Sequence, residues 1–259
     1  MALTAALADI ATIGPFFHVH THHPRTPPPA PWRPMSELTG TPDVLAARVD
    51  RIRDALAATA GRPANQIEVR VAASVAHLGL TARILSPLLA LTITIGVVPT
   101  VTLDQLYWQD ELGGAFPLSI SAPIAPATPR TPRTPGLAAV FSEQVLDGPV
   151  TAITNAVRDA RPVSELIMWG NVASAVVSAG TIITTQRPDS AGNIATLTEA
   201  LFQQPPLHGA GTLGPPFRRR SCCLIYRIAS PTPTAICGDC PLVNAHSPRN
   251  DRSRRDTRR

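Results

Sequence analysis

The sequence predicts an α+β protein: a mainly helical body, a small antiparallel sheet and a C-terminal hairpin that carries cysteines. Three observations predict this fold class. Long stretches have apolar residues at helical spacing, two short stretches alternate like strands, and all four cysteines stand in one C-terminal segment. With 259 residues, of which 44% are hydrophobic, the chain can bury a sizeable core.

Shifts in composition divide the chain into four predicted parts. An N-terminal segment with a proline-rich linker occupies residues 1–35, and a helical body occupies residues 36–207. A cysteine-bearing segment follows over residues 208–248. Residues 249–259 form a basic tail, which we expect to be a disordered, solubilising extension.

The first predicted helix has Thr41 as its N-cap and Pro42 in its first position, and a glycine follows its last residue. Its apolar residues recur every three or four positions, which indicates one buried face. For the next helix, Asn65 and Glu68 resemble a capping box. Apolar residues lie on nearly all faces of this second helix, so we expect it to be buried and to kink or end at Pro87.

Two short strands are predicted from QLYWQ at residues 105–109 and AFPLSIS at residues 115–121, joined through a pair of glycines. Prolines then stand at every third position from 123 to 135, a repeat typical of polyproline II. We interpret this repeat as a stiff connection rather than as a ligand for a proline-binding module. Helices are predicted over Leu137–Ala160, Ser164–Thr184 and Asn193–Gln203.

The net charge of +5 raises the question of a nucleic-acid partner. The tail Arg249–Arg259 holds six Arg and two Asp, a net charge of +4, which leaves about +1 for the rest of the chain. A DNA-binding domain normally spreads basic side chains over its contact surface. We therefore expect no nucleic-acid partner.

Two charge-free stretches, Ile84–Leu103 and Leu166–Gln186, are long enough to cross a bilayer. Both contain hydroxyl-bearing residues together with glycine or proline, and we predict that they are buried core segments rather than transmembrane spans. The N-terminal stretch lacks the basic start of a secretory signal. We therefore expect a cytoplasmic protein with reduced thiols, whose only membrane contact would be peripheral.

Two patterns resemble functional motifs without the required context. GAGTLG at residues 209–214 satisfies the glycine pattern of dinucleotide-binding loops, yet no strand precedes it and two prolines follow. His18, His20 and His22 would share one face of an extended chain, with His23 beside them. Because no carboxylate or cysteine is close to them in the sequence, we favour no specific metal binding there.

The four cysteines form the adjacent pair Cys222 and Cys223 and the C-x-x-C pair Cys237 and Cys240. Disulfides are not expected in a reducing compartment. Structural zinc usually takes its ligands from two C-x2–4-C turns, and an adjacent pair spans the edge of a tetrahedron poorly. A [2Fe–2S] cluster needs two thiolates on each iron. We favour the cluster, and zinc stays the alternative.

A hairpin is expected to bring the two cysteine pairs together. Leu224–Ile228 is predicted to be a strand, and SPTPT at residues 230–234 a turn. The chain would then return the C-x-x-C pair alongside the adjacent pair.

The stretches RRRSCCLIYR and CGDCPL resemble the C-terminal signature of the FhuF-like ferric-siderophore reductases. Upstream, VRVAASVAHLGLTARILSPLLA, GVVP, GGAFPLSI and WGNVAS stand in the order that such proteins show, so the resemblance covers roughly residues 65–243. Thirteen residues separate Cys223 from Cys237, three more than the family pattern usually has. We assign the surplus to the expected turn, where extra length costs little closure entropy.

The resemblance implies that Cys222, Cys223, Cys237 and Cys240 bind a [2Fe–2S] cluster in a cytoplasmic reductase. This class of protein delivers one electron to the Fe(III) of a siderophore and releases Fe(II). No catalytic residue beyond the cluster is implied, and no Ser-His-Asp or Cys-His constellation stands out in the sequence. The substrate would be a ferric siderophore. Since we recognise no nucleotide or flavin motif, a protein such as a ferredoxin or its reductase would donate the electron.

Arg218, Arg219 and Arg220 stand just before the first cysteine pair. Positive charge near an anionic cluster favours its reduced form, and the same side chains attract an anionic chelate. We interpret them as tuning or docking residues, with a solvated strand edge as the alternative. Residues 169–171, WGN, are a candidate for shaping a pocket, although core packing explains Trp169 equally well.

A second hypothesis is a non-enzymatic metal-binding or redox-sensing protein, whose cysteines hold zinc or a sensory iron–sulfur cluster. His77 supports neither reading. It lies among apolar residues of a predicted buried helix, and we interpret it as a hydrogen-bonded core residue rather than a catalytic one.

Overall fold

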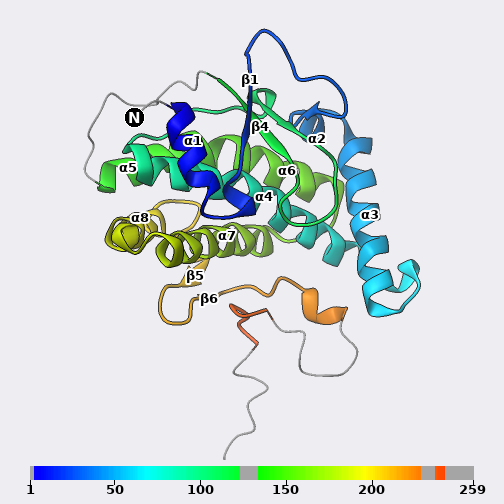
Figure 1. The fold of residues 1–259 in the computed structure, drawn as a ribbon. Coiled ribbons are helices and arrows are strands. Elements are labelled where there is room, and N and C mark those ends of the chain that lie inside the picture. The colour runs from blue at the N-terminus through cyan, green and yellow to red at the C-terminus, as the bar shows by residue number, and fades with distance from the viewer. Residues whose placement is uncertain (1–2, 123–133, 229–236, 243–259) are drawn as a thin grey trace, which may run out of the picture.

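Two long helices pack side by side at the centre of the molecule in the computed structural model, which describes residues 3–122, 134–228 and 237–242 (Figure 1). They are α4 (Val69–Ile95) and α7 (Glu165–Gln186). Both consist almost entirely of apolar and small residues, which explains why other elements cover them on several sides.

The other helices surround this central pair (Figure 1). They are α1 (Leu3–Ala11), α2 (Glu37–Gly40), α3 (Pro42–Ala60), α5 (Thr134–Phe141), α6 (Thr151–Ala160) and α8 (Ala191–Leu201). A π-helical stretch, Ser142–Val150, joins α5 to α6. The predicted proline repeat falls mainly on residues 123–133, outside the described residues.

A four-stranded sheet of order β1-β4-β3-β2 lies beside the helices. Its strands are β1 (His20–His22), β2 (Arg33–Pro34), β3 (Leu106–Trp108) and β4 (Leu118–Ser121). The antiparallel pair β3–β4 is the predicted one. The sheet is mixed rather than wholly antiparallel, because the N-terminal segment adds β1 parallel to β4. The predicted α+β class is confirmed.

Two helix starts illustrate where local signals decide the structure and where they do not. Helix α3 begins at Pro42 after Thr41, as predicted, and ends at a glycine in the left-handed conformation. The capping box predicted at Asn65 is wrong, since α4 begins only after Glu68. The Glu68 carboxylate is bound by arginine side chains instead of a backbone N–H. Helix α4 then continues past Pro87 to its end.

The later helices agree with the predicted ones within a few residues at their ends, except for one interruption. The predicted helix Leu137–Ala160 is divided at Gly148, whose φ of −87° and ψ of −114° are not helical, just before Pro149. The sequence analysis predicts no helix where α1 lies. Leu7 and Ile10 of α1 are nevertheless buried.

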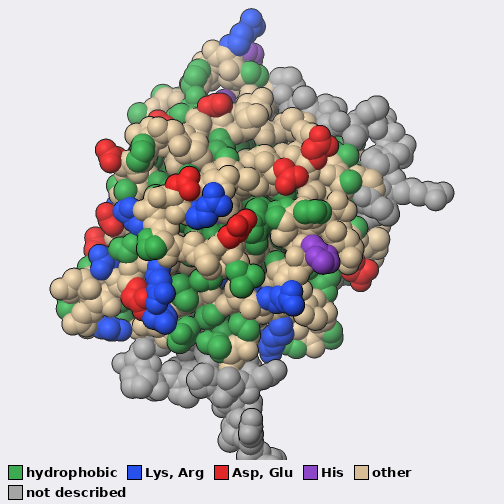
Figure 2. Space-filling model, turned by 180° about the vertical axis from the view of Figure 1, so that it is seen from behind, with side chains coloured by type: hydrophobic (Ala, Val, Ile, Leu, Met, Phe, Trp, Pro, Cys, Tyr) green, Lys and Arg blue, Asp and Glu red, His purple; other side chains and the backbone are tan. Residues whose placement is uncertain are grey.

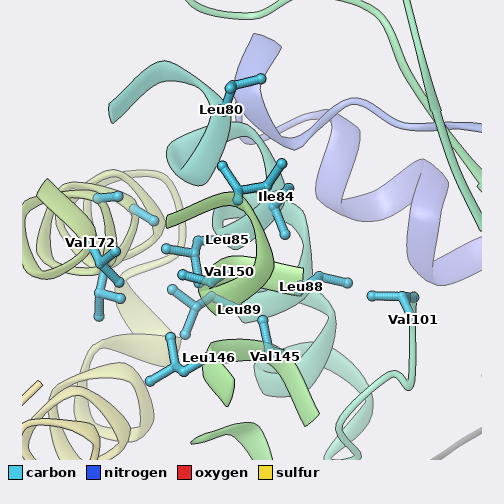
Figure 3. Packing of buried hydrophobic residues seen from close by; sticks show 14 of the residues in the cluster. Leu80, Ile84, Leu85, Leu88, Leu89, Val101, Val145, Leu146, Val150 and Val172 are labelled. Atoms are coloured by element: carbon cyan, nitrogen blue, oxygen red, sulfur yellow. The ribbon is translucent and has the colours of Figure 1, made fainter. Parts of the chain in front are cut away.

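A single large cluster of buried apolar residues fills the centre of the described chain. Figure 3 shows leucines and isoleucine of α4 meeting Val145, Leu146 and Val150 of the π-helical stretch and Val172 of α7. The N-terminal residues, Phe17 among them, join the same cluster. The division of the chain into four parts stays a prediction.

Helices α4 and α7 are each long and apolar enough to cross a bilayer. In their most apolar windows, however, 67% of α4 and 61% of α7 is buried inside the protein. This burial agrees with the prediction of core segments. Figure 2 shows one face of the molecule, on which acidic and basic side chains are interspersed rather than gathered by sign.

The guanidinium of Arg83 ties the N-terminal segment to α4. It is buried and has no carboxylate partner among the described residues; it donates to three backbone carbonyls instead. Nε binds Phe116 at 2.7 Å, Nη1 binds Phe16 at 2.8 Å and Nη2 binds His18 at 2.5 Å. Burial lowers the pKa of Arg83 to about 10, so the side chain stays charged at neutral pH.

Replacing Arg83 with Met should therefore lower the free energy of unfolding by at least about 1–3 kcal/mol, the cost of leaving the buried carbonyl of Phe116 without its donor. The bonds to Phe16 and His18 are only partly buried. Arg25→Met, at an exposed position, should change it by less than about 0.5 kcal/mol. Urea unfolding of both variants measures the difference. Equal free energies of unfolding for the two variants would contradict this role.

Candidate metal centre

The cysteine segment lies against one side of the central helix pair, below α7 in Figure 1. The short hairpin of β5 (Gly211–Thr212) and β6 (Arg218–Arg219) leads into it. After the first cysteines, Leu224 and Ile228 pack into a small apolar cluster with residues of α3 and α4. The site is thus supported by three helices that belong to the body of the fold.

The four sulfurs come together as two pairs, each made of one cysteine of the adjacent pair and one of the C-x-x-C pair. Cys223 Sγ and Cys237 Sγ lie 3.4 Å apart. The side chains of Cys222 and Cys240 lie close enough for each to alter the pKa of the other. Cys223 and Cys240 are buried, and the other two are partly exposed.

Backbone N–H groups point at the sulfurs. Leu224 N donates to Cys222 Sγ at 3.3 Å, and Leu242 N donates to Cys240 Sγ at 3.4 Å. Leu224 reaches this position with a φ of 70°, and it is the one non-glycine residue with positive φ in the described part of the chain. A leucine avoids this conformation unless its surroundings impose it, and such strain gathers at functional sites.

The predicted strand Leu224–Ile228 is wrong. Residues Ile225–Arg227 form a 3-10 turn, because the left-handed Leu224 turns the chain toward its own cysteines before extended pairing can begin. The predicted turn SPTPT lies outside the described residues. The expected meeting of the two cysteine pairs does occur.

Arg219 is the one buried member of the arginine triplet, with 3% of its surface exposed. Its Nη2 donates to Cys237 Sγ at 3.4 Å, and its Nη1 donates to Asn171 Oδ1 at 2.7 Å. Its Nε lies 3.0 Å from Asp239 Oδ2, which makes a buried ion pair. The Asp239 carboxylate also accepts a hydrogen bond from Ser174 Oγ on α7.

A second chain of hydrogen bonds connects the central helices to Cys223. Asn171 Nδ2 on α7 donates to the carbonyl and hydroxyl oxygens of Ser74 on α4, at 3.0 and 3.1 Å. Ser74 Oγ in turn donates to the carbonyl of Cys223 at 3.0 Å. Asn171 on α7 therefore binds Arg219 directly and is linked to Cys223 through Ser74 on α4. Both central helices thus hold the first part of the cysteine segment.

The side chains of the site alter one another's pKa values. The hydrogen bond between Cys223 and Cys237 lowers the pKa of Cys223 to about 7 and raises that of Cys237. Burial raises the pKa of Cys222 and of Cys240. For Asp239, burial acts to raise the pKa, but the Ser174 hydrogen bond and the Arg219 charge outweigh it, so the pKa is lowered.

The remaining two arginines of the triplet are more exposed. Arg218 Nη1 donates to the carbonyl of Gly238 at 2.7 Å, and Arg220 Nη1 donates to the carbonyl of Gly209 at 3.4 Å. Both carbonyls belong to the backbone, so these cations have no anionic partner among the described residues. Of the WGN stretch, Asn171 reaches the site, whereas Trp169 Nε1 binds Glu165 on its own helix.

Other candidate ligands do not join the site. His22 Nδ1 is hydrogen-bonded to Ser119 Oγ at 2.9 Å, and His20 packs against Trp32. His77 is fully buried and bonded to Thr154 Oγ1, as predicted, and burial lowers its pKa to about 3. Over residues 3–122, 134–228 and 237–242, no group of three or more His, Cys, Asp or Glu is arranged to hold a single metal ion, and the four cysteines meet as pairs rather than as one four-sulfur cage.

Sequence reasoning missed three contributors to the site: Asp239, Ser174 and Ser74. Each carried a signal. Asp239 stands between the two cysteines of the C-x-x-C, and the two serines are polar residues inside helices that are otherwise apolar. Within GAGTLG, Gly211 and Thr212 form β5, and the expectation that this stretch binds no nucleotide stays a prediction.

The donor set fits a two-iron cluster. Such a cluster takes two thiolates on each iron and is stabilised by hydrogen bonds to its sulfurs. Here four thiols form two pairs, two backbone N–H groups donate to the sulfurs, and a buried cation offsets the negative charge of the thiolates.

The site is that of an iron–sulfur protein. Residues 219–242 match the family model described as the FhuF 2Fe-2S C-terminal domain, so the cofactor of this segment is a [2Fe–2S] cluster. The resemblance to FhuF-like proteins is confirmed over these residues, and upstream of them it stays a prediction. No curated protein matches the chain.

Helix α7 and the cysteine segment approach closely at Gly170. A Cβ at Gly170 would lie 2.2 Å from Ser221 Oγ and 3.5 Å from Ser221 Cβ. Ser221 Oγ donates to the carbonyl of Leu166 at 2.8 Å, so it cannot turn aside without losing that bond.

Gly170→Ala should lower the free energy of unfolding by about 1–3 kcal/mol, as overpacking does, although alanine favours a helix. In the double variant Gly170→Ala, Ser221→Ala the new Cβ meets the Cβ of residue 221 and Arg219 Cδ, both at ordinary contact distances, and most of the loss should be recovered. Chemical unfolding of both variants gives the answer. A single variant that is more stable than the wild type would show that the approach is not tight.

Proposed function

We propose that this protein is a cytoplasmic ferric-siderophore reductase, in which Cys222, Cys223, Cys237 and Cys240 hold the [2Fe–2S] cluster. The observation that carries the proposal is the match of residues 219–242 to the FhuF 2Fe-2S domain. The pairing of the four sulfurs supports the ligand assignment.

The reaction transfers one electron and breaks no covalent bond. The cluster supplies the electron, and the Fe(III) of the siderophore is reduced to Fe(II), which hard oxygen donors hold far more weakly. The vacated oxygen donors take up protons from water. A donor protein, such as a ferredoxin or its reductase, returns one electron to complete the cycle.

For such a transfer the surrounding side chains need only position the cluster and the chelate and supply charge near them. No general base or nucleophile is needed, because no proton is abstracted from carbon and no acyl or phosphoryl group moves. The partial exposure of Cys222 and Cys237 supports a cluster close enough to the surface for electrons to pass in and out.

Side chains suited to contact with a chelate surround the cysteines. Tyr226 is 38% exposed, and the guanidinium of Arg227 lies beside its ring. Arg227 also donates a hydrogen bond to the Glu68 carboxylate. Arg218 and Arg220 add two cations. Ferric complexes of anionic siderophores would be attracted to such a surface.

Anaerobically purified protein should be reddish-brown and contain iron and acid-labile sulfide in equal amounts. Mixed with a ferric siderophore and a chelator of Fe(II), the reduced protein should release close to one Fe(II) per cluster. Replacing Cys237 with Ser should abolish both the colour and the release, because one iron loses a thiolate. His20→Ala, at an exposed histidine outside the site, should retain both.

Each outcome decides between the two hypotheses. Iron and sulfide without Fe(II) release would favour a redox sensor, whereas a colourless protein with zinc would favour a structural metal site. Colour that survives in the Cys237 variant and disappears in the His20 variant would reject the ligand assignment.

A further inference from the structure

The arginine triplet divides into one buried and two exposed side chains. Arg219 has 2% of its side chain exposed, whereas Arg220 is exposed and Arg218 partly so. The difference follows from β6, because successive residues of a strand point to opposite sides. Arg219 therefore points into the site, where a bulky iron chelate cannot reach it.

Every polar atom around the Arg219 guanidinium belongs to the site or to α7. The guanidinium donates to Cys237 Sγ and to Asn171 Oδ1, and its Nε lies beside the Asp239 carboxylate. The backbone N–H of Arg219 also donates to the carbonyl of Asp239, at 3.0 Å. A cation from β6 and an anion from the C-x-x-C segment thus lie next to the sulfur of Cys237.

We propose that Arg219 and Asp239 form an opposed charge pair that sets the reduction potential of the site, with Arg219 favouring the reduced state and Asp239 the oxidised state. The inference rests on the proposed cluster ligands and names the residues that control them. A reduced cluster carries one more negative charge than an oxidised one, so a neighbouring cation stabilises it and a neighbouring anion destabilises it.

Burial determines which charges matter. Interactions between exposed charges are screened by salt, and buried ones are screened much less. Arg219 and Asp239 lie in the interior, with side-chain exposures of 2% and 18%. Arg220 is exposed, and the described hydrogen bond of its side chain goes to the backbone carbonyl of Gly209, at 3.4 Å. The potential should therefore depend on the buried pair and hardly on Arg220.

Asn171 and Ser174 act as positioning residues for this pair. Asn171 Oδ1 orients the guanidinium while its amide group is bound to Ser74, and Ser174 orients the Asp239 carboxylate. Because both lie on α7, the two charges keep a fixed relation to each other.

The experiment is a redox titration of the purified, cluster-loaded protein, followed by its visible absorption. Arg219→Gln should lower the ratio of reduced to oxidised protein at a fixed applied potential by at least about tenfold, a shift of about 59 mV. Asp239→Asn should shift the ratio by a similar factor in the opposite direction. The double variant should lie close to the wild type.

Arg220→Gln is the matched control, a change of the same charge one residue away. We expect a shift of less than about threefold, which should vanish at about 1 M salt, where the Debye length is about 3 Å. The Arg219→Gln shift should persist at that salt concentration.

Three results would overturn the proposal: no shift in Arg219→Gln, a shift of the same sign in Asp239→Asn, or equal shifts in Arg219→Gln and Arg220→Gln. If Arg219→Gln fails to take up the cluster, Asp239→Asn decides alone, since the asparagine keeps an oxygen for Ser174. In that case an unchanged or lowered potential rejects the charge pair.

The titration does not involve a siderophore, so this inference and the proposed function fail separately. Wild-type protein without iron and sulfide would refute the cluster ligands and thereby the proposed function. A loaded wild-type protein whose variants show unshifted potentials would refute the charge pair alone.

Discussion

The buried guanidinium of Arg219 is the interaction on which the rest of the site depends. A cation removed from water must be paired and hydrogen-bonded, or its desolvation destabilises the fold by several kcal/mol. Arg219 meets this demand with groups from two separate parts of the chain, Asn171 on α7 and the Cys237–Asp239 turn. Burying this one side chain therefore brings the second cysteine pair to the first.

The central helices supply the surface on which this burial takes place. Helices α4 and α7 are so apolar that each could cross a membrane by composition alone. Three of the polar residues that they bury, Ser74, Asn171 and Ser174, bind groups of the cysteine segment or one another. Gly170 lies within the same stretch and leaves room for Ser221. These three polar residues and the glycine together form the part of α4 and α7 that contacts the cysteine segment.

Much of the fold and the ligand set could be predicted because their signals are local. Thr41 and Pro42 define a helix start by themselves, and the spacing of the cysteines restricts the metal chemistry. Leu224 shows the limit. Its left-handed conformation follows from the N–H bond to Cys222 Sγ and from packing against distant helices, and nothing in the residue type announces it.

The role of Arg219 lies between these cases. Three identical residues in a row carry no local difference, so the sequence could not tell which one is buried. Recognition of β6 as a strand would have provided part of the distinction, because alternation places Arg218 and Arg219 on opposite sides. A buried cation acts through a medium of low dielectric and cannot leave its place, which suits it to fix a potential. An exposed cation is screened and its side chain is free to move, which suits it to bind an anionic ligand from solution. In our proposals the same residue type serves two functions according to its burial, and at Arg219 a lysine is no substitute, because only the planar fork reaches sulfur, amide and carboxylate together.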